Sequence, residues 1–379
     1  RTLMLALRRT KCLITALLIL ACYCLSYVQG FSGSFSPKID LFARNKAMSN
    51  LRNRNRPISG QHVRPAVLNN LHMAQSGSLS LFSPAKTNLF LRITKKREDG
   101  FHELASVFQA LGLGDTLTIE ALDSSATADV LSCNVEDVPL DGRNLIIKAF
   151  DLFRERSGNT SFFRCHIDKK TPMEGGMGGG SSNCATALWA ANKLCGSLVS
   201  DQTLIEWGGE LGSDVSFFLS EGTAYCTGRG EIVDTISPPL STPPGSFWIL
   251  KPSEGCSTPA VYKALGLSPG AELPGPDPVQ LRDKLVADGL SASVCINDLE
   301  PPAQKVLPKL VAIKEALESG GFHTVLLSGS GATTFALSKD AEASPRAALE
   351  AAGVWEESMY VAGPLPFVSR KPDGWYSEQ

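Results

Sequence analysis

One glycine-rich stretch, residues 172–183 (PMEGGMGGGSSN), limits what this chain can fold into more than any other. Five of its twelve residues are glycine, and glycines let backbone N–H groups approach a ligand closely and reach positive φ without strain. The preceding SFFRCHID has the aromatic and β-branched content of a strand, and the following NCATALWAANKLCG has apolar residues at helical spacing up to Gly196. A strand, a glycine loop and a helix N-terminus in this order predict a cradle for phosphate.

Other interpretations of the loop fit less well. A flexible linker or a tight turn is the usual role of a glycine-rich run, but a linker is not followed at once by an amphipathic helix. The loop has no GK[ST] after its glycines, so it is not a P-loop, and it lacks the G-x-G-x-x-G pattern of dinucleotide binding. Because the loop has no lysine of its own, a bound phosphate needs positive charge from elsewhere in the chain.

The composition of the chain limits its partners. Its 379 residues allow roughly two domains with extensions, and 43% hydrophobic residues suffice for sizeable cores. Eleven of the 36 Lys and Arg residues but a single acid, Asp40, lie in residues 1–78, so the remainder carries an excess of twelve acids. An acidic body argues against binding of nucleic acid or of an anionic membrane, so we predict neither partner and expect a local basic pocket for a phosphorylated ligand.

The cysteines indicate neither a metal site nor a disulfide framework. Ten are present, and the seven beyond residue 24 are scattered and form no C-x-x-C pair. We therefore expect mainly buried thiols in a reducing compartment. These seven are Cys133, Cys165, Cys184, Cys195, Cys226, Cys256 and Cys295.

The N-terminal part of the chain has the composition of targeting sequences. Arg8, Arg9 and Lys11 precede an apolar run, which fits a signal peptide over residues 1–30 better than the alternative, a membrane anchor. Residues 31–78 bear Arg and Ser and almost no acid, as transit peptides do. A signal peptide followed by a transit-like segment that begins with Phe resembles the bipartite presequence of algae with complex plastids. We predict import into the plastid, with simple secretion as the alternative, and no membrane association once the leader is removed.

The rest of the chain mixes strands and helices. Residues 79–92 (SLSLFSPAKTNLFL) are expected to form two short strands broken at Pro84. Asp201 is expected to cap a helix that runs through Leu211. A Pro-rich stretch at 238–244 predicts the domain junction. Further predicted elements are a strand at 115–120, a helix at about 144–157, strands near 222–227 and 247–250, a helix at 256–265, a loop at 266–280, a helix at about 308–319 and the strands HTVLLS and TTFALS.

Several single residues have two interpretations in the sequence alone. Lys86, in an apolar strand, is more often an edge residue that prevents aggregation than a catalyst. Phe101 fits core packing, His102 fits a surface histidine, and Asp214 fits another helix cap. A second glycine loop, at 328–331, lies between two strands, where a hairpin turn is its default meaning.

A family resemblance is carried by four segments in order: PAKTNLFLRITKKREDGFHEL, GGMGGGSSNCATAL, LGSDVSFF and SGSGATTF. Together they resemble the GHMP kinase superfamily and, within it, the kinases of 4-diphosphocytidyl-2-C-methyl-D-erythritol. The resemblance runs from about Leu81 to Val361. It implies an α+β fold of two domains, an N-terminal ribosomal-S5-like domain and a C-terminal ferredoxin-like domain, with the active site in the cleft between them. We assign these domains to residues 79–240 and 246–365, followed by a tail at 366–379.

By this resemblance the catalytic residues are Lys86 and Asp214. A carboxylate can take the proton of the acceptor alcohol as the γ-phosphoryl group of ATP is transferred, and an ammonium beside it stabilises the developing charge. The resemblance implies ATP and Mg²⁺ as cofactors; Ser181 or Ser182 is expected near the metal, whose ligands stay unknown. The implied ATP loop consists of Pro172, Met173, Glu174, Gly175, Gly176, Met177, Gly178, Gly179, Gly180, Ser181 and Ser182. The second loop, which closes the cleft, consists of Ser328, Gly329, Ser330 and Gly331.

The resemblance also implies where the cytidine end of the acceptor binds. Phe101 and Tyr262 stack on cytosine, and His102 hydrogen-bonds its edge. The remaining implied substrate residues are Asn88, Thr258 and Lys263. Two residues depart from the family pattern. Phe101 replaces the usual tyrosine, which keeps stacking but loses a hydroxyl contact, and Glu174 stands where a glycine or small residue is usual.

We therefore predict a kinase that phosphorylates the 2-hydroxyl of its cytidylyl acceptor in the methylerythritol phosphate route to isoprenoids, acting as a monomer or homodimer. The first alternative is another kinase of the superfamily, such as homoserine or mevalonate kinase, which would not need Phe101, His102 and Tyr262. The second is a non-catalytic nucleotide-binding protein on the same fold. The presence of both Lys86 and Asp214 disfavours it.

Overall fold

The computed structural model describes residues 77–371 and 374–377. The predicted signal peptide and nearly all of the predicted transit-like segment lie outside these residues. The strands are β1 (Ser78–Lys96), β2 (His102–Ala121), β3 (Val130–Cys133), β4 (Phe163–Asp168), β5 (Thr223–Gly228), β6 (Ile232–Thr235), β7 (Ser246–Lys251), β8 (Thr324–Leu327), β9 (Thr334–Ser338) and β10 (Tyr360–Ala362). The helices are α2 (Leu145–Ser157), α3 (Gly179–Leu194), α4 (Asp201–Leu211), α5 (Val215–Leu219), α6 (Thr258–Leu265), α7 (Pro278–Asp288), α8 (Glu300–Val306), α9 (Lys309–Ser319) and α10 (Pro345–Ala351).

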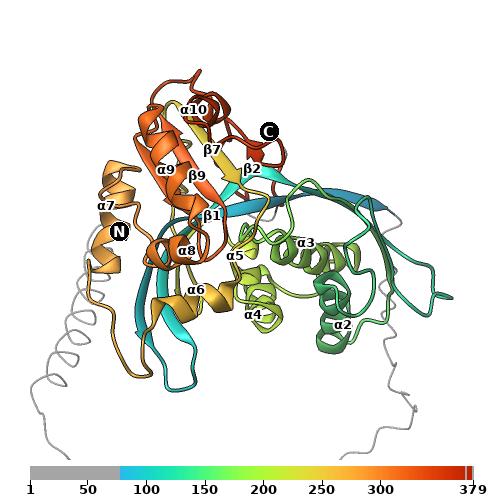
Figure 1. Ribbon diagram of the computed structural model, residues 1–379. Helices are drawn as coiled ribbons and strands as arrows, with labels where there is room; N and C mark the ends of the chain where they lie inside the picture. The colour runs from blue at the N-terminus through green and yellow to red at the C-terminus, as the bar shows by residue number, and fades with distance from the viewer. Residues whose placement is uncertain (1–76, 372–373, 378–379) are drawn as a thin grey trace, which may run out of the picture. The chain divides into compact units, whose positions relative to one another are not determined.

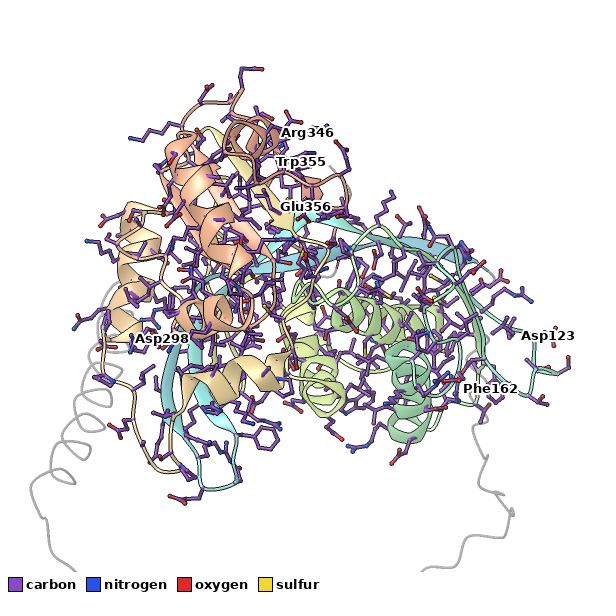
Figure 2. The ribbon with its side chains drawn as sticks, in the orientation of Figure 1. Asp123, Phe162, Asp298, Arg346, Trp355 and Glu356 are labelled. Carbon is purple, nitrogen blue, oxygen red and sulfur yellow. The ribbon has the colours of Figure 1, made fainter. Side chains whose placement is uncertain are left out.

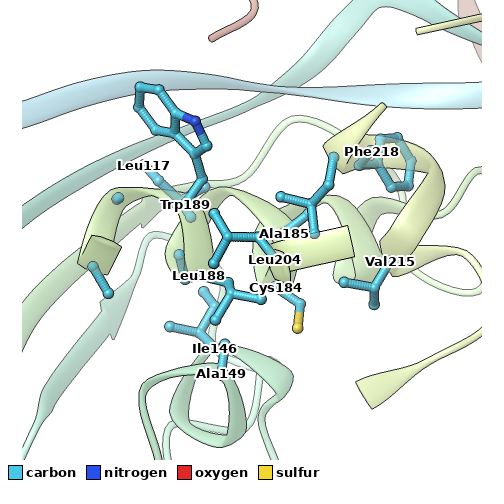
Figure 3. Packing of buried hydrophobic residues seen from close by; sticks show 14 of the residues in the cluster. Leu117, Ile146, Ala149, Cys184, Ala185, Leu188, Trp189, Leu204, Val215 and Phe218 are labelled. Carbon is cyan, nitrogen blue, oxygen red and sulfur yellow. The ribbon is translucent and has the colours of Figure 1, made fainter. Parts of the chain in front are cut away.

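The larger of two sheets carries helices α2 to α5 on one side (Figure 1). Its strands run in the order β3, β4, β2, β5, β6, and β1 also pairs with β2. At the centre of the packing, α3 buries Ala185, Leu188 and Trp189 together with Leu117 of β2 and Ile146 of α2 (Figure 3). The helix after the glycine loop is therefore buried on nearly all sides rather than amphipathic, and this burial fixes its N-terminus.

β1 is one strand of 19 residues, so the prediction of two strands broken at Pro84 is wrong. Its register with β2 shifts between Pro84 and Lys86, which means that the strand passes the proline through a bulge. The strand predicted at 115–120 is only the end of β2, which begins at His102. The bulge matters for function because it changes the direction of the side chains that follow it.

The smaller sheet has the order β10, β7, β9, β8, and its described pairs are antiparallel. Helices α9 and α10 pack on it: Ile313 and Leu317 of α9 and Leu349 of α10 share a buried cluster with Val325 of β8 and Ala336 of β9. The second glycine loop connects β8 to β9, so its interpretation as a hairpin turn is confirmed.

The segment before α8 is bonded to β1. The Leu91 N–H donates to the Ile296 carbonyl at 2.8 Å, and the Asp298 N–H donates to the Leu91 carbonyl at 3.0 Å. The Asp298 carboxylate, labelled in Figure 2, accepts from the Ile93 N–H at 2.8 Å and from the Arg92 guanidinium at 3.2 Å. β1 therefore belongs to the larger sheet and also anchors the later part of the chain.

The segment predicted as a tail, 366–379, returns to the larger sheet where it is described. Val368, Trp375 and Tyr376 are buried in the core beneath that sheet. The Trp375 indole N–H donates to the Phe82 carbonyl in β1 at 2.8 Å. The C-terminal residues thus complete a core that begins at the other end of the described chain.

Three helix starts differ from the prediction. Ser200, not Asp201, caps α4, because its hydroxyl accepts a backbone N–H of the first turn. Asp201 instead forms an ion pair with Arg370. Helix α7 begins at Pro278, inside the predicted loop at 266–280. Helix α3 begins at Gly179, inside the glycine loop and four residues before the predicted start at Asn183. The other predicted helices and strands are confirmed, with ends that differ by one or two residues.

The described cysteines are free thiols, as the sequence predicted. Cys133 is half-buried and the others are buried. Burial raises the pKa of Cys165 and of Cys295 to about 12, so both thiols stay protonated near neutral pH. Within residues 77–371 and 374–377, no helix combines the length and the apolar character that crossing a bilayer requires.

Candidate active site

The structure brings Lys86 and Asp214 together. Lys86 is almost fully buried in β1, with 5% of its surface exposed, and its ammonium lies 3.3 Å from the Asp214 carboxylate. It also donates to the side-chain oxygen of Asn88 at 3.0 Å and lies 4.3 Å from the centre of the Phe108 ring. A charge buried this deeply needs such partners. Lys86 is therefore not an exposed edge residue.

Asp214 occupies the N-cap position of α5 but does not cap the helix. Its side chain accepts no N–H group of α5 and instead faces Lys86, with 28% of the side chain exposed. The turn between β5 and β6 lies beside it, since a Cβ on Gly230 would be 3.7 Å from its Oδ1 oxygen. With an ammonium on one side and partial exposure, the carboxylate remains accessible to a substrate hydroxyl.

The first glycine loop runs directly against Lys86. Gly176 and Gly178 have φ values of 71° and 69°, in the left-handed region that favours glycine. A Cβ on Gly178 would lie 2.9 Å from the Phe218 ring and 3.2 Å from the Lys86 side chain. The Lys86 N–H donates to the Met177 carbonyl at 2.9 Å. The loop and β1 are thus joined through the backbone of Lys86.

A cavity of about 380 Å³ adjoins this loop. Its lining includes residues 172–181 together with Arg143, Asn144 and Lys169. Loop backbone, a helix N-terminus and two cations form surroundings that suit a triphosphate. Arg143 and Lys169 thus bring cationic side chains to the cavity, and each is paired with a carboxylate, Asp141 and Asp115 respectively.

The two serines at the end of the loop differ in their access to this cavity. Ser181 lines it and Ser182 does not. Ser182 is fully buried, and its hydroxyl is bonded to the Ser83 hydroxyl at 2.8 Å. Among the described residues, no cluster of three or more His, Cys, Asp or Glu side chains is arranged to hold a metal ion. Of the two serines, only Ser181 is therefore open to this cavity.

Glu174 is the unusual residue of the loop. It adopts a φ of 56°, a conformation that costs a residue with a Cβ roughly 1–2 kcal/mol. It is exposed and lines the first cavity as well as a second one of about 570 Å³. Its carboxylate is therefore close to where phosphate would bind.

The second glycine loop contacts both the first loop and β1. The Thr333 hydroxyl donates to the Gly175 carbonyl, and a Cβ on Gly331 would lie 2.9 Å from the same oxygen. The Ser328 hydroxyl accepts the Asn88 N–H at 3.0 Å. Because the Asn88 side chain also accepts a hydrogen bond from the Lys86 ammonium, hydrogen bonds connect both loops to Lys86.

Two buried residues that hold the second loop and Asn88 in place were not predicted from the sequence. Asn297 is buried and donates to the carbonyls of Leu327 and Gly329, both at 2.8 Å, which fixes the second loop. Ser106 accepts from the Asn88 amide at 2.9 Å. A lone Asn or Ser in a buried segment has no periodicity or spacing that would reveal such a role.

The residues predicted for the cytidine end also come together in part. The rings of His102 and Tyr262 lie with their centres 4.6 Å apart. His102 Nε2 is buried and has no hydrogen-bond partner in the part of the chain that the structure describes. Burial and, less strongly, the charge of Lys96 lower the pKa of His102. Burial, assisted by Asp214, raises the pKa of Tyr262 to about 12. Both rings are therefore neutral near pH 7.

Phe101, predicted as a stacking ring, is 54% exposed. Its ring centre lies 5.3 Å from the Arg229 guanidinium. More than half of this side chain is free to meet a flat ligand, so the structure does not support its interpretation as a core residue.

Helix α6 carries the remaining predicted substrate residues. The Thr258 hydroxyl is bonded to the Ser330 hydroxyl at 2.9 Å, which joins α6 to the second glycine loop. Thr258, Glu174 and Gly331 help to line the second cavity. Lys263, further along α6, is exposed.

Comparison with known proteins gives the family. Residues 144–222 match the family described as GHMP kinases N terminal domain, and residues 280–357 match GHMP kinases C terminal. The 4-diphosphocytidyl-2-C-methyl-D-erythritol kinase of Protochlamydia amoebophila is 41% identical over 300 residues, which cover 79% of this chain and 93% of that protein. The chain belongs to the 4-diphosphocytidyl-2-C-methyl-D-erythritol kinase family.

Further relatives in this family match as well. The chloroplastic 4-diphosphocytidyl-2-C-methyl-D-erythritol kinase of Arabidopsis thaliana is 52% identical over 260 residues, 67% of this chain. The chain spans 66% of that relative's length, slightly under two thirds. A crystal structure of 4-(cytidine 5'-diphospho)-2C-methyl-D-erythritol kinase matches with a TM-score of 0.59 at 31% identity, over 77% of this chain and 100% of that one.

These findings confirm the two-domain α+β fold of GHMP kinases and the kinase class that the sequence predicted. The predicted domain limits, 79–240 and 246–365, stay predictions. So do the roles of the individual site residues.

Proposed function

We propose that this protein transfers the γ-phosphoryl group of ATP to the 2-hydroxyl of 4-diphosphocytidyl-2-C-methyl-D-erythritol. The observation that carries the proposal is the surroundings of the Lys86–Asp214 pair. Lys86 contacts the first glycine loop, and Asp214 is close enough to Tyr262 for its charge to act on that ring. The base, Asp214, and the cation, Lys86, thus have the glycine loop on one side and the rings of His102 and Tyr262 on the other. This arrangement supports phosphoryl transfer from a nucleotide to a cytidylyl acceptor.

Asp214 is the general base of this proposal. It accepts the proton of the acceptor hydroxyl as that oxygen bonds to the γ-phosphorus and the bond from the γ-phosphorus to the bridging oxygen breaks, so that ADP leaves. Lys86 orients the carboxylate, and its charge offsets the negative charge on the transferred group. Asn88 holds Lys86 in place. Most of the rate then comes from positioning rather than from covalent chemistry.

The loop at 172–182 binds the nucleotide phosphates through its N–H groups and the N-terminus of α3. Arg143 and Lys169 add positive charge at the cavity wall. Mg²⁺, when bound, neutralises part of the triphosphate charge. The loop offers the Ser181 hydroxyl as an oxygen ligand, which fits an ion that is held mainly by phosphates and water.

The cytidine end decides which acceptor is used. Phe101 and Tyr262 stack on cytosine, which contributes roughly 1–3 kcal/mol per base. The neutral His102 bonds the edge of the base through its buried, unpartnered Nε2. Asn88 lines the polyol site, and Thr258 and Lys263 of α6 complete the acceptor site.

We further propose that the protein acts in the plastid, reached through a bipartite presequence of the complex-plastid type. The chloroplastic names of the Arabidopsis and tomato relatives support a plastid location. A fluorescent protein fused behind residues 1–78 should enter the plastid of a complex-plastid alga. Retention in the secretory pathway would contradict the proposal. Whether the enzyme is a monomer or a homodimer stays a prediction, which sedimentation velocity can test.

The activity is tested by ADP release with Mg-ATP and one of three acceptors. We expect release with 4-diphosphocytidyl-methylerythritol and none with homoserine or mevalonate. Release only with homoserine or mevalonate would keep the superfamily and contradict the cytidine site. Bound ATP without release in any arm would favour a nucleotide-binding protein instead.

A further inference from the structure

Asp115, in β2, is a fully buried carboxylate that the proposed chemistry does not use. Its Oδ1 oxygen accepts the Lys170 N–H at 2.9 Å and the Thr171 N–H at 2.8 Å. Its Oδ2 oxygen accepts from the Lys169 ammonium at 2.6 Å and from the Asn183 side-chain amide at 2.9 Å. Four donors thus share one carboxylate, two on each oxygen.

These four donors lie at the two ends of the first glycine loop. Lys169, Lys170 and Thr171 directly precede the loop, and Asn183 follows it in the first turns of α3. Asp115 therefore connects both ends of the loop to a single point on the sheet.

The partner strand extends this connection. Ser83 of β1 lies opposite Asp115 in the strand register. Its hydroxyl accepts from the Asn183 amide at 2.9 Å and donates to the Ser182 hydroxyl at 2.8 Å. The Asn183 side-chain amide thus donates to both β1 and β2. The four side chains of this network are buried: Ser83, Asp115, Ser182 and Asn183. The start of α3 is held by β1 and β2 together.

A buried ion pair such as Asp115–Lys169 fixes the position of its two side chains more than it adds to the stability of the fold. Desolvation offsets much of the attraction between its charges, yet removal of one partner leaves the other uncompensated. The Lys169 ammonium is held at a useful place: it lies 3.3 Å from where a Cβ on Gly179 would be, and Lys169 lines the nucleotide cavity. Asp115 thus holds a cation beside the N-terminus of α3.

We propose that Asp115 is a positioning residue for the nucleotide. It holds the two ends of the loop at the spacing that lets the loop N–H groups meet the triphosphate, and it holds Lys169 at the cavity wall. The inference rests on the proposed function, because it requires that the loop binds ATP. Asp115 acts through the loop, so its loss raises the KM for ATP and leaves the KM for the acceptor nearly unchanged.

Asp129 provides a matched control. Its side chain is 5% exposed and accepts from the Arg154 guanidinium at 3.1 and 2.7 Å and from the Phe163 N–H at 2.8 Å. It is also a buried aspartate paired with a cation and a backbone donor, but none of its donors belongs to the glycine loop. Asp129→Asn removes a comparable charge without touching the loop.

The test compares Asp115→Asn with Asp129→Asn in the full chain. In Asp115→Asn an amide group faces the donors of Lys169 and Asn183. We expect the KM and the calorimetric Kd for ATP to rise roughly tenfold or more, with the KM for the acceptor within about twofold. Asp129→Asn should lower the thermal midpoint and leave both KM values unchanged. Equal loss of stability in the two variants with an unchanged KM for ATP would overturn the proposal.

A second pair of variants decides the matter if Asp115→Asn does not fold. Lys169→Arg keeps the charge and the partner of Asp115, whereas Lys169→Met removes both. We expect Lys169→Arg to retain most of the ATP affinity and Lys169→Met to lose it; equal affinity in the two would overturn the proposal. Failure of the proposed function is a different result, because wild-type protein would then release no ADP with the cytidylyl acceptor.

Discussion

The nucleotide end and the cytidine end of this site are built in different ways. At the proposed nucleotide end the site presents mainly backbone, and the loop that presents it is fixed by the buried side chains of Asp115, Ser83 and Asn183. At the proposed cytidine end the site presents side chains, those of Phe101, Tyr262 and His102. Of these, Phe101 is 54% exposed, and its ring centre lies 5.3 Å from the Arg229 guanidinium.

The difference follows from what each end must recognise. A triphosphate is bound by converging N–H groups, which every residue type supplies, so geometry matters more than identity. A base is distinguished by its face and its edge, which need aromatic rings and a neutral imidazole. Substitutions should therefore act through loop position at one end and through lost contacts at the other.

The largest effect is expected between the two ends, at Asp214. Asp214→Asn keeps the shape of the side chain and removes the base, so kcat should fall roughly 10³-fold. The Kd for ATP and the thermal midpoint should stay close to wild type, because the side chain does not cap α5. Initial-rate assays and calorimetry measure both. Turnover near that of wild type would exclude Asp214 as the base.

Removal of both rings should affect only the cytidine end. In Phe101→Ala with Tyr262→Ala the KM for the acceptor should rise roughly 10²-fold, since each ring contributes stacking energy. The KM for ATP should not change. Phe101→Tyr with Tyr262→Phe is the matched control, because it keeps both rings and should bind the acceptor nearly as wild type does. If the KM for ATP rose as much as the KM for the acceptor, the nucleotide and the cytidine group would not bind at separate parts of the site.

The pH dependence of acceptor binding should report His102. Burial lowers its pKa below 6.5, so the ring is neutral at pH 7 and gains a proton only as the pH falls through that lowered value. The protonated ring can no longer accept a hydrogen bond, so the KM for the acceptor should rise at low pH by up to roughly tenfold. His102→Gln does not titrate and should give a flat profile. The same low-pH rise in His102→Gln would assign the titration to another group.

The smallest effect is expected at Glu174. Glu174→Gly removes the cost of a positive φ and should stabilise the protein by about 1 kcal/mol. It also removes a negative charge beside the phosphates, so the KM for ATP at saturating Mg²⁺ should fall by about twofold or threefold. Glu174→Gln separates the two causes, because it removes the charge and keeps the strained backbone. If Glu174→Gln gained as much stability as Glu174→Gly, measured by thermal unfolding, the strain would not be the cause.

The first glycine loop could be predicted from the sequence, but the buried side chains that hold it could not. Glycine spacing reveals a loop such as 172–182 because only glycine tolerates its φ values and close contacts. The carboxylate that holds the loop, Asp115, stands in a strand and has no such signal. Its role exists only once β2 is packed against the base of the loop. Asn297, which holds the second loop, was missed for the same reason.

Two errors in the fold prediction have physical causes outside the local sequence. Pro84 was expected to break a strand, but a bulge let β1 continue because proline only removes one donor. Asp201 was expected to cap α4, but the preceding Ser200 does so and leaves Asp201 free to pair with Arg370. Both depend on contacts between distant segments, which local patterns do not contain.

The most direct test of a divided site is the ratio of kcat/KM for two acceptors at saturating Mg-ATP. One is 4-diphosphocytidyl-methylerythritol, and the other is the same polyol carrying only a phosphate in place of the cytidylyl group. If the rings of Phe101 and Tyr262 and the imidazole of His102 read the base, the first should be preferred by roughly 10³-fold or more, and the double ring variant should lose most of that preference. Equal kcat/KM for the two acceptors would show that the protein does not recognise the cytidine group, and this would contradict a site divided into a nucleotide end and a cytidine end.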